Sequence, residues 1–205
     1  MIQERDIFQQ NSLVNKKYLE TIKIKDGEIF HLSYHQKRLS TTLGKASFFL
    51  KEIITPPKEG LYRCRVVYDA NAYTVEYFPY SKRSVKSLKL VYCDAIKYDK
   101  KYANRSEIDT LMEQKGECDD ILIVKDGLIR DTSIANVAFK QNKQWFTPLS
   151  PLLHGTTRQR LFDTGKIKVK DIRVEDLKNF SQIALMNAMI DFDIITNENI
   201  REIIC

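Results

Sequence analysis

The sequence predicts an α+β fold, in which a first half that mixes strands with a helix is followed by a β-rich second half. Of the 205 residues, 43% are hydrophobic and 29% are charged, which is typical of a globular chain. Short runs rich in β-branched and aromatic residues end at turn-forming pairs such as Asp-Gly. Segments with helical periodicity separate some of these runs.

The first half is expected to contain two strand pairs with a helix between them. The strands are predicted at residues 18–24, 29–32, 61–68 and 73–80. Asp26-Gly27 lies between the first two and is a strong hairpin signal. Ser33 and Gln36 form a Ser-x-x-Gln capping box, which predicts a helix over residues 34–43.

The second half is expected to begin after a polar segment at residues 79–84, which follows a proline. We therefore predict an N-terminal α+β domain over residues 1–82 and a C-terminal β-rich domain over residues 83–205. Five strands are predicted at residues 88–93, 120–124, 128–131, 137–139 and 144–146, and helices at 104–115, near 155–164 and at 174–180. The last four of these strands suggest a meander or a barrel-like wall.

Composition and charge exclude several classes of protein. The net charge is +6, but lysine and arginine are spread along the chain, so nucleic acid is not an expected partner. The apolar runs are too short to span a membrane, and the N-terminus lacks a signal-peptide pattern, which favours a cytoplasmic protein. The four cysteines and three histidines are dispersed, so we expect reduced thiols and no metal site.

Two segments could supply reactive groups. Lys101, where a strand is expected to give way to a helix, could be a partly desolvated nucleophile, although a solvated surface lysine is the simpler interpretation. Asp131 ends one predicted strand and Asn136 opens the next. An acid at this place can pair with a cationic ring nitrogen, but an ordinary turn explains the same residues.

Two further segments could bind an anion. Thr156 and Thr157 follow Gly155 at the expected start of a helix, where backbone N–H groups attract anions, although plain helix capping is the alternative. Arg38 shares a helix face with His35 and could grip a phosphate, or simply lie on the surface. Arg63 and Arg65 alternate on a predicted strand, which suggests either a carboxylate contact or solvated surface.

The order of these motifs resembles the class IV, or fold-type IV, pyridoxal-phosphate aminotransferase family. The family includes branched-chain aminotransferases, D-amino-acid aminotransferases and 4-amino-4-deoxychorismate lyases. The motifs, in chain order, are His-x-x-Arg-Leu, Lys-x-x-Asn, Asp-x-x-x-x-Asn and Gly-Thr-Thr-Arg. The resemblance extends from Leu19-Glu20-Thr21-Ile22 to Asn187-Ala188-Met189, which is most of the chain.

The resemblance implies a two-domain D-amino-acid aminotransferase-like fold with pyridoxal 5'-phosphate as its cofactor. Lys101 would be the catalytic residue and the covalent attachment point, in preference to its neighbour Lys100. Asp131 would pair with the pyridine nitrogen, where the family usually has glutamate. The remaining cofactor-binding residues would be Arg38, Asn136, Thr156, Thr157, Asn187 and Ala188.

The resemblance also implies a homodimer that acts on a small amino or carboxylate substrate. The Lys-x-x-Asn-Arg form of the lysine motif, at residues 101–105, looks closest to the lyase members, which release pyruvate to give 4-aminobenzoate for folate biosynthesis. An aminotransferase acting on a branched-chain or other small amino acid is the first alternative. A non-catalytic binding protein on the same fold is the second.

Overall fold

A computed structural model of the protein describes residues 16–45, 48–196, 200 and 203–204. The chain forms two compact units, each described separately below. The first unit comprises Met1–Tyr80 together with Lys100–Asn104, and the second comprises Ser81–Asp99 and Arg105–Cys205. The short segment that contains Lys101 therefore belongs to the first unit, although the chain on both sides of it belongs to the second.

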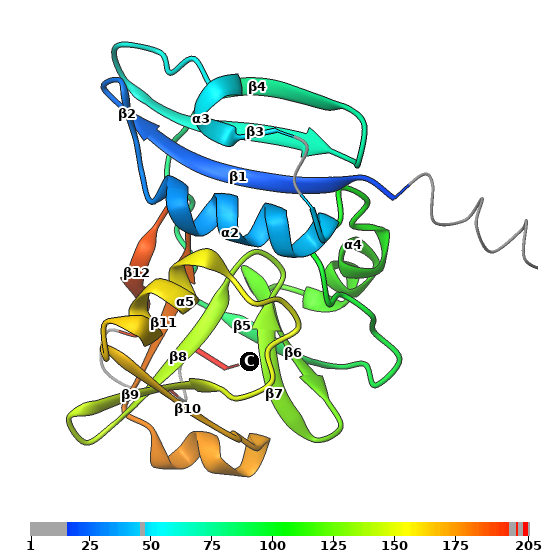
Figure 1. The fold of residues 1–205 in the computed structure, drawn as a ribbon. Helices are drawn as coiled ribbons and strands as arrows, with labels where there is room; N and C mark the ends of the chain where they lie inside the picture. Colours follow the sequence, from blue (N-terminus) through cyan, green and yellow to red (C-terminus); the bar gives the residue numbers. More distant parts are fainter. Residues whose placement is uncertain (1–15, 46–47, 197–199, 201–202, 205) are drawn as a thin grey trace, which may run out of the picture. The chain divides into compact units, whose positions relative to one another are not determined.

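The first unit is built on a four-stranded antiparallel sheet with the order β2-β1-β3-β4. Its strands are β1 (Tyr18–Lys25), β2 (Glu28–Ile29), β3 (Leu61–Tyr68) and β4 (Tyr73–Pro79). Helix α2 (Leu32–Leu43) lies along one face of this sheet, and the short helix α3 (Leu50–Ile53) follows it (Figure 1). Ile22, Leu39 and Val66 are fully buried between α2 and the sheet.

The hairpin predicted at Asp26-Gly27 is present, but the helix after it begins differently from the prediction. Asp26 and Gly27 both have positive φ (48° and 84°), as a tight hairpin turn requires. Helix α2 begins at Leu32 after His31, which has a left-handed φ of 54° and gives no side-chain cap. The predicted capping box at Ser33 is therefore wrong. The side chain of Gln36 instead accepts the Leu50 N–H at 2.8 Å and joins α2 to α3.

The second unit contains an eight-stranded sheet. Its strands are β5 (Leu88–Tyr92), β6 (Asp120–Lys125), β7 (Leu128–Thr132), β8 (Asn136–Gln141), β9 (Gln144–Pro148), β10 (Ile167–Lys170), β11 (Gln182–Asn187) and β12 (Asp191–Ile194). The main order is β10-β9-β8-β7-β6-β5, and β11 pairs with both β8 and β12. Within the described residues β10 and β5 end this path unpaired with each other, so the predicted barrel-like closure is not seen.

Helices of the second unit are α4 (Ser106–Met112), the 3-10 turn η1 (Glu113–Lys115), α5 (Thr156–Asp163) and the 3-10 helix η2 (Val174–Asn179). The predicted helix over residues 104–115 thus starts later and ends in a tighter 3-10 turn. The α+β class is confirmed by these elements.

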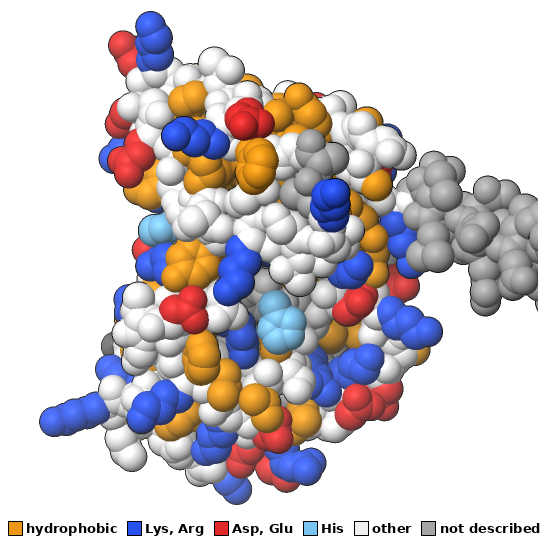
Figure 2. Space-filling view, viewed as in Figure 1, with side chains coloured by type: hydrophobic (Ala, Val, Ile, Leu, Met, Phe, Trp, Pro, Cys, Tyr) orange, Lys and Arg blue, Asp and Glu red, His pale blue; other side chains and the backbone are white. Residues whose placement is uncertain are grey.

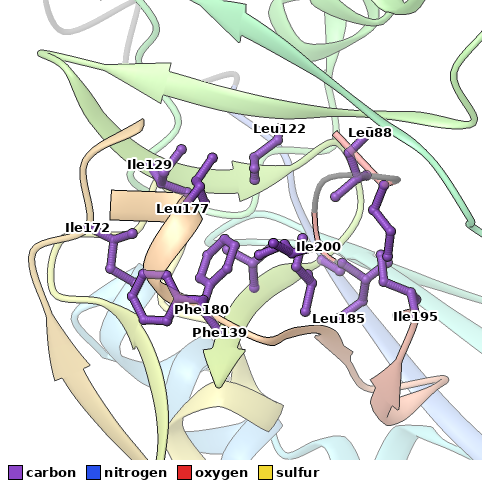
Figure 3. Packing of buried hydrophobic residues seen from close by; sticks show 14 of the residues in the cluster. Leu88, Leu122, Ile129, Phe139, Ile172, Leu177, Phe180, Leu185, Ile195 and Ile200 are labelled. Atoms are coloured by element: carbon purple, nitrogen blue, oxygen red, sulfur yellow. The ribbon is translucent and has the colours of Figure 1, made fainter. Parts of the chain in front are cut away.

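Buried apolar side chains from both ends of the second unit's sequence pack together (Figure 3). Leu88, Leu122 and Phe139 from the strands are fully buried there, and Phe180 lies against Phe139 with ring centroids 5.4 Å apart. Cys118 is disulfide-bonded, so the expectation of reduced thiols is wrong at this residue. Among the described residues, no helix is both long and apolar enough to cross a membrane.

Candidate functional site

A wholly buried carboxylate binds two basic side chains in the first unit. Glu20 lies on β1 with 0% of its surface exposed, and His35 and Arg38 lie one turn apart on α2. The Arg38 guanidinium donates from Nε to Glu20 Oε1 at 2.7 Å and from Nη2 to Oε2 at 2.5 Å. His35 Nδ1 lies 2.6 Å from the same Oε2. This bidentate arrangement fixes the face that α2 turns toward β1.

The charges of this cluster follow from its partners. Burial raises the pKa of Glu20, but Arg38 and His35 outweigh it and hold the value at about 2. Burial lowers the pKa of His35, more than the bond to Glu20 raises it. At neutral pH the imidazole is therefore neutral, and its Nδ1–H donates to an ionised Glu20. The sequence analysis missed Glu20 as the partner of Arg38.

The segment that carries Lys101 is attached to the N-terminal end of β1. The Leu19 N–H donates to the Lys101 carbonyl at 2.8 Å, and the Ala103 N–H donates to the Lys17 carbonyl at 2.8 Å. Between these bonds Tyr18 and Tyr102 form an antiparallel bridge. The positive charge of Lys101 contributes to the lowered pKa of His35, so the amine and the Glu20 cluster influence each other electrostatically.

The neighbouring lysine has a different environment. Lys100 Nζ donates to the Thr42 carbonyl near the end of α2 at 3.1 Å. The same ammonium lies 5.5 Å from the centre of the Tyr18 ring. Lys100 therefore supports the attachment of this segment to the first unit.

Asp131 is a buried carboxylate of the second unit. It lies near the end of β7 with 5% of its surface exposed. The Asn136 side-chain amide donates to Asp131 Oδ1 at 2.7 Å and to the Leu153 carbonyl at 2.8 Å. The Leu153 N–H donates to Asp131 Oδ2 at 2.9 Å. Asp131 thus binds the backbone N–H of Leu153 and Asn136 binds its carbonyl, and Leu153 lies in the loop that leads to α5.

The partners of Asp131 are mostly neutral donors, and this sets its protonation. Burial raises the pKa of Asp131 to about 6, and the bonds from Leu153 and Asn136 and the charge of Arg158 offset only part of this effect. Arg158 is itself buried and donates to the Pro148 carbonyl at 2.8 Å. Asp131 is therefore mostly ionised at neutral pH, but protonation lies within reach of mild acid.

Helix α5 begins directly after this network. Gly155 precedes the helix, and a Cβ atom at this position would lie 2.0 Å from Asn136 Oδ1. Only glycine allows the Asn136 amide to keep its place. Thr156 and Thr157 form the first turn of α5 and are buried. Their backbone N–H groups belong to the end of a helix that attracts anions.

Asn187 closes a turn after β11. Its side-chain Oδ1 accepts the N–H groups of Met189 at 2.9 Å and Ile190 at 3.0 Å. Its amide donates to the Ile134 carbonyl at 3.3 Å, and Ala188 lies in the turn that Asn187 shapes. The turn therefore lies beside the loop between β7 and β8.

The predicted site residues divide between the two units. Lys101 and Arg38 belong to the first unit, whereas Asp131, Asn136, Thr156, Thr157, Asn187 and Ala188 belong to the second. The motif predicted Gly155 only as part of an anion-binding helix start and gave Arg158 no role. Their signal was the Gly-Thr-Thr-Arg pattern itself, in which glycine makes room for Asn136 and arginine faces Asp131.

The paired arginines on β3 behave as strand surface. Arg65 donates to Glu76 at 2.7 Å across the sheet, and Arg63 lies over the ring of Phe78. Lysine and arginine side chains are interspersed with acidic ones on the face shown in Figure 2. Among the described residues, no group of histidine, cysteine, aspartate and glutamate has the arrangement of a metal site.

Comparison with known proteins assigns the chain to a family. Residues 72–196 match the family described as amino-transferase class IV. The chain belongs to this family. It is 41% identical over 180 residues to an uncharacterized protein of Haemophilus influenzae, a match that covers 83% of this chain and 96% of that protein.

Solved structures of family members agree with this assignment. A crystal structure from Haemophilus somnus, named a "putative 4-amino-4-deoxychorismate lyase", is 39% identical and has a TM-score of 0.78. The match covers 85% of this chain and 97% of that one. A "hypothetical aminotransferase" of Mycobacterium tuberculosis in a PLP-bound form is 18% identical, has a TM-score of 0.70 and covers 87% of this chain and 80% of its own, which shows the shared fold. Members of this class IV family bind pyridoxal phosphate.

Proposed function

We propose that this protein is a pyridoxal-phosphate-dependent 4-amino-4-deoxychorismate lyase that releases pyruvate and forms 4-aminobenzoate. The observation that carries the proposal is the extended similarity, at 39% identity, to a family member with that name. The Lys-x-x-Asn-Arg motif at residues 101–105 supports the same assignment. The likeness to aminotransferases at 14–20% identity extends to the fold and does not favour their reaction.

The residues present fit pyridoxal phosphate. The cofactor needs an amine for covalent attachment, an acid for its ring nitrogen and donors for its phosphate. Lys101 supplies the amine, and Asp131 supplies a buried carboxylate with a pKa of about 6. Gly155 makes room for the Asn136 amide that holds Asp131, and the buried Thr156 and Thr157 begin α5 directly after it.

Each residue then has a defined task. We assign the ring-nitrogen contact to Asp131, which Asn136 and the Leu153 N–H hold in place. Asn136 is thus a positioning residue for the acid. The phosphate contacts fall to Arg38, Thr156, Thr157 and the Asn187-Ala188 turn. Arg38 enters this task already oriented by Glu20.

Lys101 carries the proton chemistry of the proposal. A bound cofactor would supply an electron-withdrawing ring next to the substrate carbon that loses its proton. Lys101 Nζ would accept that proton as the general base. Loss of pyruvate leaves an aromatic product, which drives the reaction toward 4-aminobenzoate.

Covalent labelling tests the cofactor assignment. Purified protein would be incubated with pyridoxal phosphate, reduced with borohydride and digested for peptide mapping. We expect the label on Lys101, with no label on Lys101→Ala and normal labelling of the matched control Lys100→Ala. A label on Lys100, or none on the wild type, would overturn the assignment.

The substrate assignment needs its own assay. Holoenzyme would be supplied with aminodeoxychorismate, and the formation of 4-aminobenzoate and pyruvate would be followed. Equal amounts of both products, absent with Lys101→Ala, are the expected result. If keto acids form from amino acids instead, the protein is an aminotransferase of the same family. The homodimer stays a prediction, which light scattering of the purified protein checks.

A further inference from the structure

The turn between β7 and β8 is held by side chains from three other elements. Residues 133 and 134 form this turn, directly after Asp131 and Thr132. Arg105, which precedes α4, donates from Nη2 to the Ser133 carbonyl at 2.8 Å. Asp120, the first residue of β6, accepts the Ser133 N–H at 3.3 Å, and Asn187 donates to the Ile134 carbonyl.

The turn needs this support because the two strands beside it are barely paired. β7 and β8 share a single register pair, Asp131 with Asn136. By comparison, β8 and β9 share three such pairs, and β8 and β11 share five. A ladder of this kind normally fixes the geometry of a hairpin. On its other side β7 pairs with β6, with Thr132 opposite Leu122, and Thr132 N–H donates to the Ala135 carbonyl across the turn at 2.9 Å. The contacts to Ser133 add to these and hold the side of the turn that the β7–β8 ladder leaves weak.

Asp120 is the more deeply buried of the two side chains that contact Ser133. It has 0% of its surface exposed, and its Oδ1 also accepts the N–H of Ile121. Within the described residues its Oδ2 is buried without a hydrogen-bond partner, whereas the Arg105 guanidinium is partly exposed and also lies 3.9 Å from Asp109. A buried carboxylate with an unsatisfied oxygen is costly to keep, so its contact with Ser133 calls for an explanation.

We propose that Arg105 and Asp120 are positioning residues that grip Ser133 from its two sides and thereby fix the depth at which Asp131 meets the ring of the bound cofactor. The ring contact rests on the proposed function, whereas the placement of Asp131 rests on the contacts above. We call these two contacts to Ser133 the clamp. The clamp also gives a physical role to the arginine of the Lys-x-x-Asn-Arg motif. It lies four residues after Lys101, at the point where the chain enters the second unit.

The test compares Arg105→Met with Lys125→Met. Lys125 is a matched control, because its Nζ also donates to a backbone carbonyl of the second unit, that of Ile96, at 2.8 Å. Both substitutions remove one positive charge. Carboxyl NMR of aspartate-labelled apoprotein would follow the titration of Asp131, identified by its absence in Asp131→Asn. The charged group that faces Asp131 from α5 is Arg158, with His154 next to Arg158 in turn, and both are unchanged in every variant.

We expect Arg105→Met to lower the pKa of Asp131 by about one unit, because a loosened turn admits water to the carboxylate. We also expect the dissociation constant for pyridoxal phosphate to rise about tenfold. Lys125→Met should change neither quantity, and Arg105→Lys should restore part of both because it keeps a donor. If Arg105→Met is poorly folded, Asp120→Asn removes the other half of the grip and is measured in the same way.

The outcomes separate this inference from the proposed function. If Asp131 titrates alike in Arg105→Met and Lys125→Met, the clamp is refuted, whether or not the cofactor binds. If the wild type takes up no pyridoxal phosphate at Lys101, the proposed function fails. The titration of Asp131 in the apoprotein then still decides whether the clamp exists.

Discussion

Each unit has a buried strand carboxylate with a shifted pKa, and the two shifts are opposite. Glu20 on β1 and Asp131 on β7 expose 0% and 5% of their surfaces. The pKa of Glu20 is about 2, whereas that of Asp131 is about 6. Burial acts in the same direction on both groups, so it does not explain the difference.

The difference lies in the charge of the hydrogen-bond donors. Glu20 accepts two bonds from the Arg38 guanidinium, so the ionised form is strongly favoured. Asp131 accepts its bonds from the amide groups of Asn136 and Leu153, which satisfy geometry without supplying a full charge. The first carboxylate is suited to a permanent structural charge. The second remains adjustable, which suits a group that must respond to a cationic ring.

The largest expected effect is the loss of the charge that balances Glu20. Arg38→Met leaves a buried carboxylate without its cation, and we expect the free energy of unfolding to fall by about 3–5 kcal/mol. Arg65→Met is the matched control, because Arg65 pairs with Glu76 at side-chain exposures of 37% and 47%. There we expect a loss of about 0–1 kcal/mol. Urea denaturation of both variants measures the difference, and equal losses would contradict the comparison.

The next effect concerns the neutral network of Asp131. In Gly155→Ala the new Cβ would lie 2.0 Å from Asn136 Oδ1, so the amide that holds Asp131 must move. We expect a loss of about 1–3 kcal/mol in the free energy of unfolding. We also expect a raised pKa of Asp131, because the hydrogen bond from Asn136 lowers it in the wild type. Gly165→Ala is the control, because its φ of 70° also disfavours alanine although no atom lies within 4 Å. A normal Asp131 titration in Gly155→Ala would show that the amide is not needed.

Local sequence signals predicted the elements that local chemistry determines. Asp26-Gly27 and Asp126-Gly127 both adopt the positive φ values of hairpin turns. The start of α2 was misplaced because His31 takes the left-handed conformation, which no propensity argument favours over the Ser33 cap. The predicted barrel-like closure is not seen. Closure depends on which strands pair at the two ends of the sheet, and local sequence patterns do not determine this.

The site was predictable as an ordered set of residues and not as a set of contacts. Motif order indicated Lys101, Asp131 and Arg38, whose roles stay predictions that labelling and titration can test. The partner of Arg38 could not be derived from sequence, because Glu20 lies 18 positions away and meets Arg38 only when α2 packs on β1. In the same way, Arg105 meets Ser133 across 28 positions. Such contacts depend on how segments that are far apart in the sequence pack in the fold.

The smallest effect is the dependence of stability on pH, and it distinguishes the two carboxylates by sign. The folded pKa of Glu20, about 2, lies below its ordinary value of 4.5, so its contribution is present above pH 4.5 and is lost as the pH falls toward 2. The folded pKa of Asp131, about 6, lies above its ordinary 3.8, so its contribution is present below pH 3.8 and is lost as the pH rises through 6. Each slope is at most about 1.4 kcal/mol per pH unit.

Stability curves of Glu20→Gln and Asp131→Asn, each relative to the wild type, test the signs of these slopes. The destabilisation caused by Glu20→Gln should grow as the pH rises from 2 to 4.5, the range set by the shift of Glu20. That caused by Asp131→Asn should shrink between pH 3.8 and 6. The pKa of His35 is lowered, so His35 makes the wild type more stable as the pH rises toward 6.5, opposite to the effect of Asp131. This contribution cancels in the Asp131→Asn comparison, because that variant keeps His35. Slopes of the same sign for the two variants would mean that burial, and not the charge of the donors, controls both carboxylates.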